Sequence, residues 1–166
     1  MLSKFGGTVS PELLRMLRKA RDFHGHMGPF LVIGVRAGLT GLQRLNVERG
    51  DISLHATVWL KYSTPFSCVA DGVQVSTGCT YGNKRLTVKD SDGIMVRVEN
   101  HDGQVNIALR GETLNDLKMQ VLSRNLCDSE LERLAYEIAT VDESKLFIIQ
   151  SGAYTMPINS QRAIYS

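Results

Sequence analysis

The sequence predicts an α+β fold, with hairpin-linked strands beside clustered helices. Two amphipathic helical segments come first, a group of short strands with tight turns occupies the middle, and two further helical segments follow. Strands joined by tight turns pair antiparallel, and this order lacks the regular strand–helix alternation of a doubly wound parallel sheet. We therefore expect a mostly antiparallel sheet with helices packed on it.

The first two helices are predicted from their start signals and apolar spacing. Ser10 can cap a helix that Pro11 opens, and apolar residues then recur at helical spacing. This helix should end near Phe23, because two glycines and a proline follow. Pro29 should open a second helix that reaches about Leu45.

Three glycines lie three or four residues apart in the second helix: Gly34, Gly38 and Gly41. Glycine inside a helix costs about 1 kcal/mol relative to alanine. A neighbour that packs very close would offset this cost. We expect a tight contact between this helix and the sheet rather than a ligand site.

Strict alternation of apolar and polar residues predicts a half-buried strand over residues 52–62. A short helix should follow, carrying Cys68 and Asp71 and ending at Gly78. Three strands come next, and their two connections, at residues 92–93 and 102–103, are both Asp-Gly, a hairpin signal.

Two amphipathic helices and a last strand complete the predicted elements. Ser129 and Glu132 have the spacing of a capping box for the second of these helices. The last strand is expected over residues 146–149. We find no internal repeat and no linker, so residues 1–166 are expected to form a single domain.

Composition and charge exclude several classes of protein. The chain has 19 Lys and Arg against 17 Asp and Glu, for a net charge of +2. This balance gives no reason to expect a nucleic acid or an acidic membrane as a partner. The N-terminus lacks a secretory pattern, and no stretch approaches the roughly 20 apolar residues that span a bilayer. We expect a cytoplasmic protein.

Three cysteines, Cys68, Cys79 and Cys127, are too few and odd in number for a disulfide framework. Free thiols in a reducing compartment remain available for metal binding or chemistry. The absence of any Cys-x-x-Cys pair excludes a self-contained zinc ribbon. Cys127 has no histidine or cysteine nearby in the sequence and is interpreted as structural.

Two histidines flank a glycine in the predicted link between the first two helices. Gly25 lets the chain turn sharply, so His24 and His26 can both face one pocket. Neutral imidazole is a common metal ligand. Neighbouring histidines also often cap helices or pack, and this alternative stays open. His55 and His101 lie on the polar side of a strand and in a turn, and neither is expected to bind metal.

Cys68 and Asp71 lie three residues apart, on one face of the predicted short helix. A thiol near a helix N-terminus has a lowered pKa, which favours the thiolate that metals require. Asp71 could orient a ligand histidine. Cys79 follows the helix, where the chain can fold back toward Cys68. Two cysteines and a histidine would leave an open fourth position, as in catalytic zinc sites. The alternatives are a buried apolar cysteine and a solvated aspartate.

Four blocks of the sequence resemble the FmdE-like family, named after the FmdE component of formylmethanofuran dehydrogenase. They are residues 23–26, 34–38, 68–74 and 77–84. The blocks occur in the family's order and at similar separations, and together they cover roughly the first hundred residues. The rest of the chain matches only in position and helical character.

The resemblance implies an FmdE-like fold with a mixed, mostly antiparallel sheet, similar to the catalytic domain of glyceraldehyde-3-phosphate dehydrogenase. It also implies a homodimer. A transition metal, most often zinc, would be bound by His26, Cys68 and Cys79. His24 and Asp71 would be neighbouring pocket residues and are the candidates for catalysis.

The family is named for an operon of molybdenum formylmethanofuran dehydrogenase, an enzyme of methanogenesis that reduces carbon dioxide to a formyl group on methanofuran. The resemblance therefore implies an accessory or metal-handling role in one-carbon and molybdenum enzyme metabolism, with a molybdenum or tungsten enzyme complex as a possible partner. The alternative is a stand-alone zinc-dependent enzyme in which His24 or Asp71 transfers protons. A third interpretation is a structural metal that stabilises a dimer.

Two departures separate this chain from many family members. Gly28 stands where they have a cysteine, which removes one possible ligand or redox thiol. The chain also lacks the four-cysteine zinc ribbon with which many members end. Both departures argue against a role that needs additional thiols, and both leave the predicted three-ligand site in place.

Overall fold

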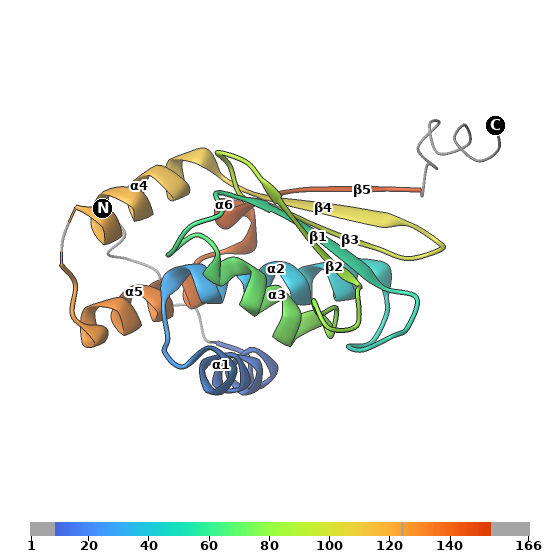
Figure 1. Cartoon of the computed structure of the whole chain (residues 1–166), viewed down its shortest axis with the longest axis horizontal. Coiled ribbons are helices and arrows are strands. Elements are labelled where there is room, and N and C mark those ends of the chain that lie inside the picture. The colour runs from blue at the N-terminus through green and yellow to red at the C-terminus, as the bar shows by residue number, and fades with distance from the viewer. Residues whose placement is uncertain (1–8, 124, 154–166) are drawn as a thin grey trace, which may run out of the picture.

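The computed structural model describes residues 9–123 and 125–153, which form six helices and one five-stranded sheet (Figure 1). The elements in chain order are α1 (Pro11–His24), α2 (Pro29–Leu45), β1 (His55–Leu60), α3 (Cys68–Thr77), β2 (Leu86–Asp90), β3 (Met95–Glu99), β4 (Gln104–Leu109), α4 (Gly111–Leu122), α5 (Asp128–Thr140), α6 (Glu143–Leu146) and β5 (Phe147–Gly152). Helices beside a largely antiparallel sheet confirm the predicted α+β fold.

The strand order is β2-β1-β3-β4-β5, with β1 and β2 parallel and the other neighbours antiparallel. The sheet is therefore mixed and mostly antiparallel, as predicted. The turn at residues 102–103 does join a hairpin, β3–β4, and Asn100 accepts from both backbone N–H groups of that turn. The expected hairpin at residues 92–93 is wrong. The strand β1 lies between β2 and β3 and pairs with both, so this turn joins strands that are not neighbours.

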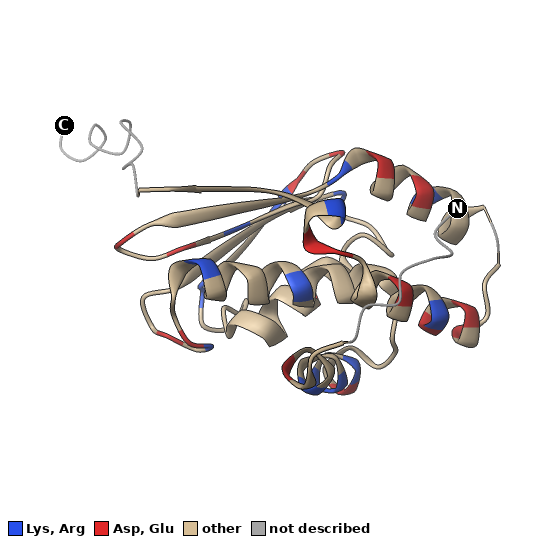
Figure 2. Ribbon diagram, turned by 180° about the vertical axis from the view of Figure 1, so that it is seen from behind, with Lys and Arg blue, Asp and Glu red and all other residues tan. Residues whose placement is uncertain are grey.

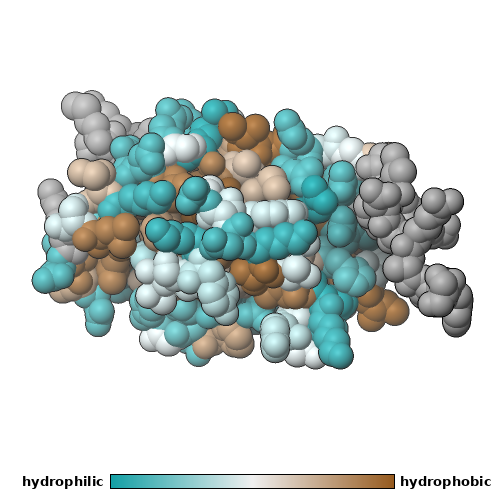
Figure 3. Space-filling view, turned by 45° about the horizontal axis from the view of Figure 1, so that its top comes forward, coloured by the Kyte–Doolittle hydropathy of each residue, from teal (hydrophilic) through white to brown (hydrophobic). Residues whose placement is uncertain are grey.

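Alternation along the strands buries one face of the sheet. Val58, Val96 and Ile107 point into the core, and the next residues along each strand are half-buried on the other face. Trp59, the only tryptophan, lies on that second face with Lys89 and Arg97 beside its ring, 5.3 Å and 5.2 Å from the centroid. Figure 3 shows a mixture of polar and apolar patches in the view that brings the top of the molecule forward.

The helices α2 and α3 form a layer between the sheet and α1 (Figure 1). Gly34 and Gly72 allow these two helices to approach closely. A Cβ atom on Gly34 would lie 2.1 Å from the Val69 carbonyl oxygen, and one on Gly72 would lie 2.3 Å from the Leu31 carbonyl oxygen. Both distances are far below any real contact with backbone, so the two glycines fix the distance between α2 and α3.

The expectation that the glycines of α2 pack against the sheet is only partly right, as the surroundings of Gly38 and Gly41 show. A Cβ atom on Gly38 would lie 1.9 Å from Ser76 Oγ in α3, whereas one on Gly41 would lie 2.5 Å from Val98 in β3. Only the last glycine of the row makes the expected tight contact with the sheet. The first two serve a contact between helices.

Several boundaries differ from their predictions. The strand predicted over 52–62 is limited to β1, because residues 51–53 form a turn in which Asp51 accepts from the Ser53 N–H and hydroxyl. The capping box of α5 uses Cys127 and Glu130, two residues before the predicted pair. The short helix α6 was not predicted, and β5 runs three residues past the expected end of the last strand.

Arg36, which has no obvious partner in the sequence, joins α2 to the end of α5. Its guanidinium donates to the carbonyl oxygens of Ile138 and Val141, at 2.7 Å and 2.6 Å. Burial lowers the pKa of Arg36, and the carboxylates of Glu143 and Asp142 oppose that shift. The last helices are thereby attached to the central layer.

Most charged residues in the view from behind lie on the outer helices α1, α4 and α5, whereas the strands are largely uncharged (Figure 2). Within the described residues, no helix combines the length and the apolar character that crossing a membrane requires.

Candidate functional site

The two histidines lie where α1 ends and α2 begins. His24 is the last residue of α1, and Gly25 caps the helix in the left-handed region at φ +96°. Gly28 is the N-cap of α2, and Pro29 occupies its first position. The side chain of His24 is 13% exposed, whereas His26 is exposed. The glycines and the proline therefore confine both imidazoles to one tight corner of the fold.

His24 forms a short hydrogen bond with Asp71 of α3. The distance from His24 Nδ1 to Asp71 Oδ2 is 2.6 Å. A carboxylate only accepts, so Nδ1 carries the proton, and in its neutral form the ring presents a lone pair at Nε2. Gln74 Nε2 donates to the other oxygen of Asp71, at 3.1 Å. The ring of His26 lies 4.6 Å from the ring of His24, tilted by 40°.

The Nε2 atom of His24 is buried and has no hydrogen-bond partner within the described part of the chain. Burying a polar atom without a partner is unfavourable by roughly 1–3 kcal/mol, and such atoms are rare in folded proteins. A histidine held by a carboxylate at one nitrogen and open at the other has the arrangement of a metal ligand or of a general base.

Cys68 is the first residue of α3, one turn before Asp71. Its position at the helix N-terminus is as predicted, but the pKa of its thiol is not lowered. Burial raises the pKa of Cys68, and the nearby carboxylate of Asp71 raises it further. Desolvation disfavours the charged thiolate and the Asp71 carboxylate repels it, while a backbone hydrogen bond acts in the opposite direction.

Cys79 lies at the other end of α3, two residues after its last residue, and is fully buried. Its N–H donates to Thr77 Oγ1 at 3.0 Å, and its Sγ lies 3.5 Å from the Leu54 carbonyl oxygen. Burial raises the pKa of this thiol too. A ten-residue helix is about 15 Å long. The two cysteines are therefore held apart instead of folding back on one another.

The structure thus places the predicted residues in two groups. His24, His26 and Asp71 meet at one corner, with Cys68 one turn from Asp71, and Cys79 lies beyond the far end of α3. No group of three or more His, Cys, Asp or Glu side chains that could hold a metal occurs in residues 9–123 and 125–153. Within these residues, His24 Nε2 is a buried donor without a partner, and the length of α3 separates Cys79 from Cys68.

Sequence reasoning missed the role of Gln74. Its side chain holds both Asp71 and the backbone N–H of Tyr81, at 3.1 Å and 3.0 Å. The three-residue spacing of Asp71 and Gln74 on one helix is the signal that could have indicated the first of these contacts. The hydrogen bond between His24 and Asp71 joins residues 47 positions apart, and their proximity was expected from the family resemblance rather than from a local pattern.

A solved structure shares the fold. This is an FmdE-like protein of the tungsten formylmethanofuran dehydrogenase type from Syntrophus aciditrophicus, with a TM-score of 0.61 and 20% sequence identity over 86% of this chain and 73% of that one. A curated relative from Archaeoglobus fulgidus, called a probable S-adenosyl-L-methionine-binding protein, is 39% identical over 79 residues. That match covers 48% of this chain, which spans only 22% of the relative's length.

The fold and the corner between α1, α2 and α3 define a small α+β protein with a partly buried histidine–carboxylate pair. The chain belongs to the FmdE family, whose model, described as FmdE of the molybdenum formylmethanofuran dehydrogenase operon, matches residues 23–148. The matched range includes His24, His26, Asp71 and all three cysteines.

Proposed function

We propose that this protein binds a transition metal, most simply zinc, and serves in an accessory or metal-handling role beside a molybdenum or tungsten enzyme. The observation that carries the proposal is the Nε2 atom of His24, which is buried and unpartnered while Asp71 holds Nδ1. Histidines that bind metals are commonly held in this way by a carboxylate at the other nitrogen. The family's operon supplies the enzyme context.

The donors considered at this corner share His26 and Cys68 with the predicted ligands and include His24 in place of Cys79. His26 has its ring beside that of His24, and Cys68 shares a helix face with Asp71, which contacts His24. We therefore propose that His24 Nε2 contacts the metal, that His26 and Cys68 would have to move toward the same ion to complete the site, and that Asp71 fixes the orientation of His24. One thiolate and two imidazoles suit zinc. A bound zinc would act as a Lewis acid or be passed to a partner protein.

The proposal is tested by measuring zinc binding to purified, metal-free protein. We expect one zinc per chain, with binding weakened at least about tenfold by His24→Ala and by Cys68→Ser. His55→Ala and Cys127→Ser remove an exposed histidine and an exposed cysteine and are matched controls. Circular dichroism verifies that each variant folds.

The same experiment distinguishes the proposed ligands from those predicted by the sequence. If Cys79→Ser abolishes zinc binding in a folded protein while His24→Ala leaves it intact, the set of His26, Cys68 and Cys79 is restored and His24 Nε2 is not a ligand. If the wild-type protein binds no zinc, the metal-binding role itself is wrong.

A stand-alone enzyme is the second candidate, because the pair formed by His24 and Asp71 also suits proton transfer. The carboxylate accepts from Nδ1, so the Nε2 lone pair is available to take a proton from a substrate or from water. Co-purification of the protein with a molybdenum or tungsten enzyme would favour the accessory role. Zinc-dependent turnover by the isolated protein, lost in Asp71→Asn, would favour the enzyme.

A homodimer is a further part of the proposal, and the exposed face of the sheet supports it. The residues Trp59, Met95, Ala108 and Ile148 lie opposite one another on neighbouring strands and form an apolar row across four strands. A row of this kind can pack against its own copy about a twofold axis. Sedimentation should give a dimer, and Met95→Lys should give a monomer.

A further inference from the structure

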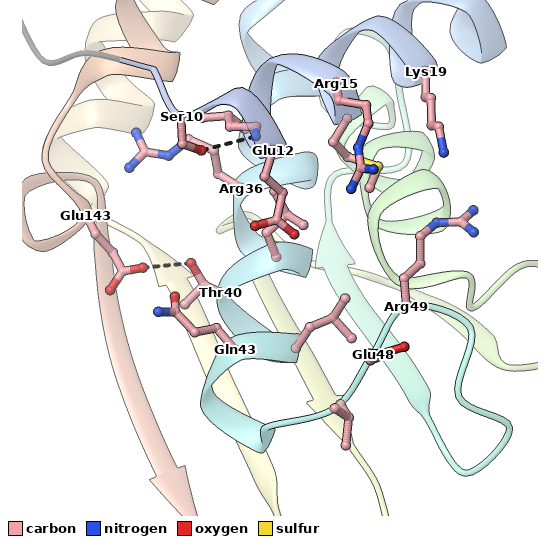
Figure 4. A pocket seen from close by; sticks show the side chains of 15 residues that line it. Ser10, Glu12, Arg15, Lys19, Arg36, Thr40, Gln43, Glu48, Arg49 and Glu143 are labelled. Atoms are coloured by element: carbon pink, nitrogen blue, oxygen red, sulfur yellow. Dashed lines mark hydrogen bonds between the residues drawn. The ribbon is translucent and has the colours of Figure 1, made fainter.

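A cavity lies away from the histidine corner, between the first part of α1, the second part of α2 and the segment that leads to β1. Its volume is about 800 Å³, within the range of small-molecule sites. None of the proposed metal-binding residues lines it. Figure 4 shows its charged and polar side chains. The cavity is independent of the metal proposal.

Three cations from two segments gather on one side of this cavity. Arg15 and Lys19 project from successive turns of α1, and Arg49 faces them from the segment after α2 (Figure 4). Like charges four residues apart on a helix repel one another. Within the described residues, the structure records no ion pair for Arg15 or Lys19, and Arg49 Nε donates to the Val75 carbonyl oxygen. An anion at this place would relieve the repulsion.

The opposite side of the cavity is already paired internally. The carboxylate of Glu143 accepts from the Thr40 hydroxyl and from Arg44, each at 2.7 Å. The guanidinium of Arg36 is bound to two backbone carbonyls. Two further lining carboxylates lie nearer the cations: Figure 4 shows Glu48 beside Arg49 and Glu12 between Arg36 and Arg15. Neither forms an ion pair in the described chain, so both can accept from a donor on a ligand.

Part of the cavity lining is apolar. The side chains of Leu13, Met16, Leu39 and Leu42 contribute to it, and Met16 and Leu42 are buried. An apolar surface beside a cluster of cations binds a molecule that has an apolar body and a charged end better than it binds a small inorganic ion.

We propose that this cavity binds a small organic phosphate, whose doubly charged group contacts Arg15, Lys19 and Arg49 and whose apolar part lies on the leucine- and methionine-lined surface. A phosphate accepts several charge-assisted hydrogen bonds, and arginine and lysine are its usual partners. A phosphate matches several converging cations better than a carboxylate, which carries one charge.

Phenyl phosphate is a suitable probe, with inorganic phosphate and benzoate as comparisons. Calorimetric titration of the full chain at low salt should show saturable 1:1 binding of phenyl phosphate. Inorganic phosphate lacks the apolar ring and benzoate lacks the second charge, so both should bind more weakly. Absence of saturable phenyl phosphate binding would overturn the proposal, and equal binding of benzoate would overturn the assignment to phosphates.

Variants of α1 locate the site. Arg15→Ala and Lys19→Ala should each weaken phenyl phosphate binding about fivefold, as expected for one exposed charge contact. Arg18→Ala removes an equally exposed cation from the same helix that does not line the cavity, and it should leave the affinity unchanged. An equal loss in Arg18→Ala would show attraction to the general charge of α1 and would refute a defined site.

Discussion

A cysteine lies at the N-terminal end of α3 and another lies just beyond its C-terminal end. The two ends of the helix differ in how completely their polar groups are hydrogen-bonded. At the C-terminal end, the hydroxyl groups of Ser76 and Thr77 donate to backbone carbonyls of the preceding turn, and Thr77 also accepts from the Cys79 N–H. At the N-terminal end, the contact between Asp71 and His24 leaves a buried nitrogen unpaired. The hydrogen bonds at the C-terminal end therefore serve the local structure. The unpaired nitrogen at the N-terminal end is available to bind a ligand.

The largest effect is expected from a substitution that disrupts the close packing of α3 against α2, on which both ends of α3 depend. Gly72→Ala would place a Cβ atom 2.3 Å from the Leu31 carbonyl oxygen, so α2 and α3 must separate. We expect the free energy of unfolding to fall by about 3 kcal/mol or more, measured by urea denaturation. Gly111→Ala, where a Cβ atom meets nothing within 4 Å, is the control. A stable Gly72→Ala protein would show that the helices can shift apart at little cost.

The paired end is tested by Thr77→Val, which keeps the side-chain shape and removes the hydroxyl. The Cys79 N–H and the Val73 carbonyl oxygen both lose a buried partner. We expect a loss of about 2 kcal/mol in the free energy of unfolding and no change in zinc affinity. A Thr77→Val protein with weakened zinc binding would contradict the division of roles between the two ends.

The unpaired end is tested by Asp71→Asn, which keeps the shape of the side chain and removes its charge. We expect zinc affinity to fall about tenfold or more, because His24 loses the carboxylate that orients it and raises its basicity. The free energy of unfolding should change less than in Thr77→Val. Zinc titration and urea denaturation of the same preparation give both values, and a change in stability alone would assign Asp71 a structural role.

The smallest effect concerns alkaline pH. Burial raises the pKa of Cys79, so the folded state holds this proton more tightly than the unfolded state does. The resulting contribution to stability is complete below the unfolded thiol pKa, about 8.5, and is lost as the pH rises through the folded value. Cys79→Ala should therefore lose less stability between pH 8 and pH 10 than the wild-type protein. An unchanged dependence in Cys79→Ala, matching that of the exposed-site control Cys127→Ala, would contradict this assignment.

Much of the fold follows from local signals in the sequence. Pro11 and Pro29 start α1 and α2 as expected, Gly78 ends α3, and alternation locates the strands. The order of strands was not predictable in the same way. The Asp-Gly turn before β3 suggests a hairpin, yet β1 takes the place beside β3 through pairing between distant segments, which no local signal specifies.

The sequence identifies the residues of the candidate site, but it does not show which of them lie together in the fold. The sequence indicates that His24, His26, Cys68 and Asp71 matter, and these lie at one corner of the fold. The expectation that differs from the fold concerns Cys79, which was expected to fold back toward Cys68 after the short helix. The ten residues of α3 lie between the two cysteines as a rigid helix, which holds them apart.

The contact of Arg36 with the end of α5 has a consequence for the order in which the chain folds. The last turn of α5 contains no basic residue of its own, and the cation at its C-terminus comes from α2, about a hundred residues earlier. A cation at that end of a helix is stabilising. During synthesis α2 emerges before α5, so the residue that supplies this charge precedes the helix that it stabilises. As an isolated peptide, α5 would lack this stabilisation.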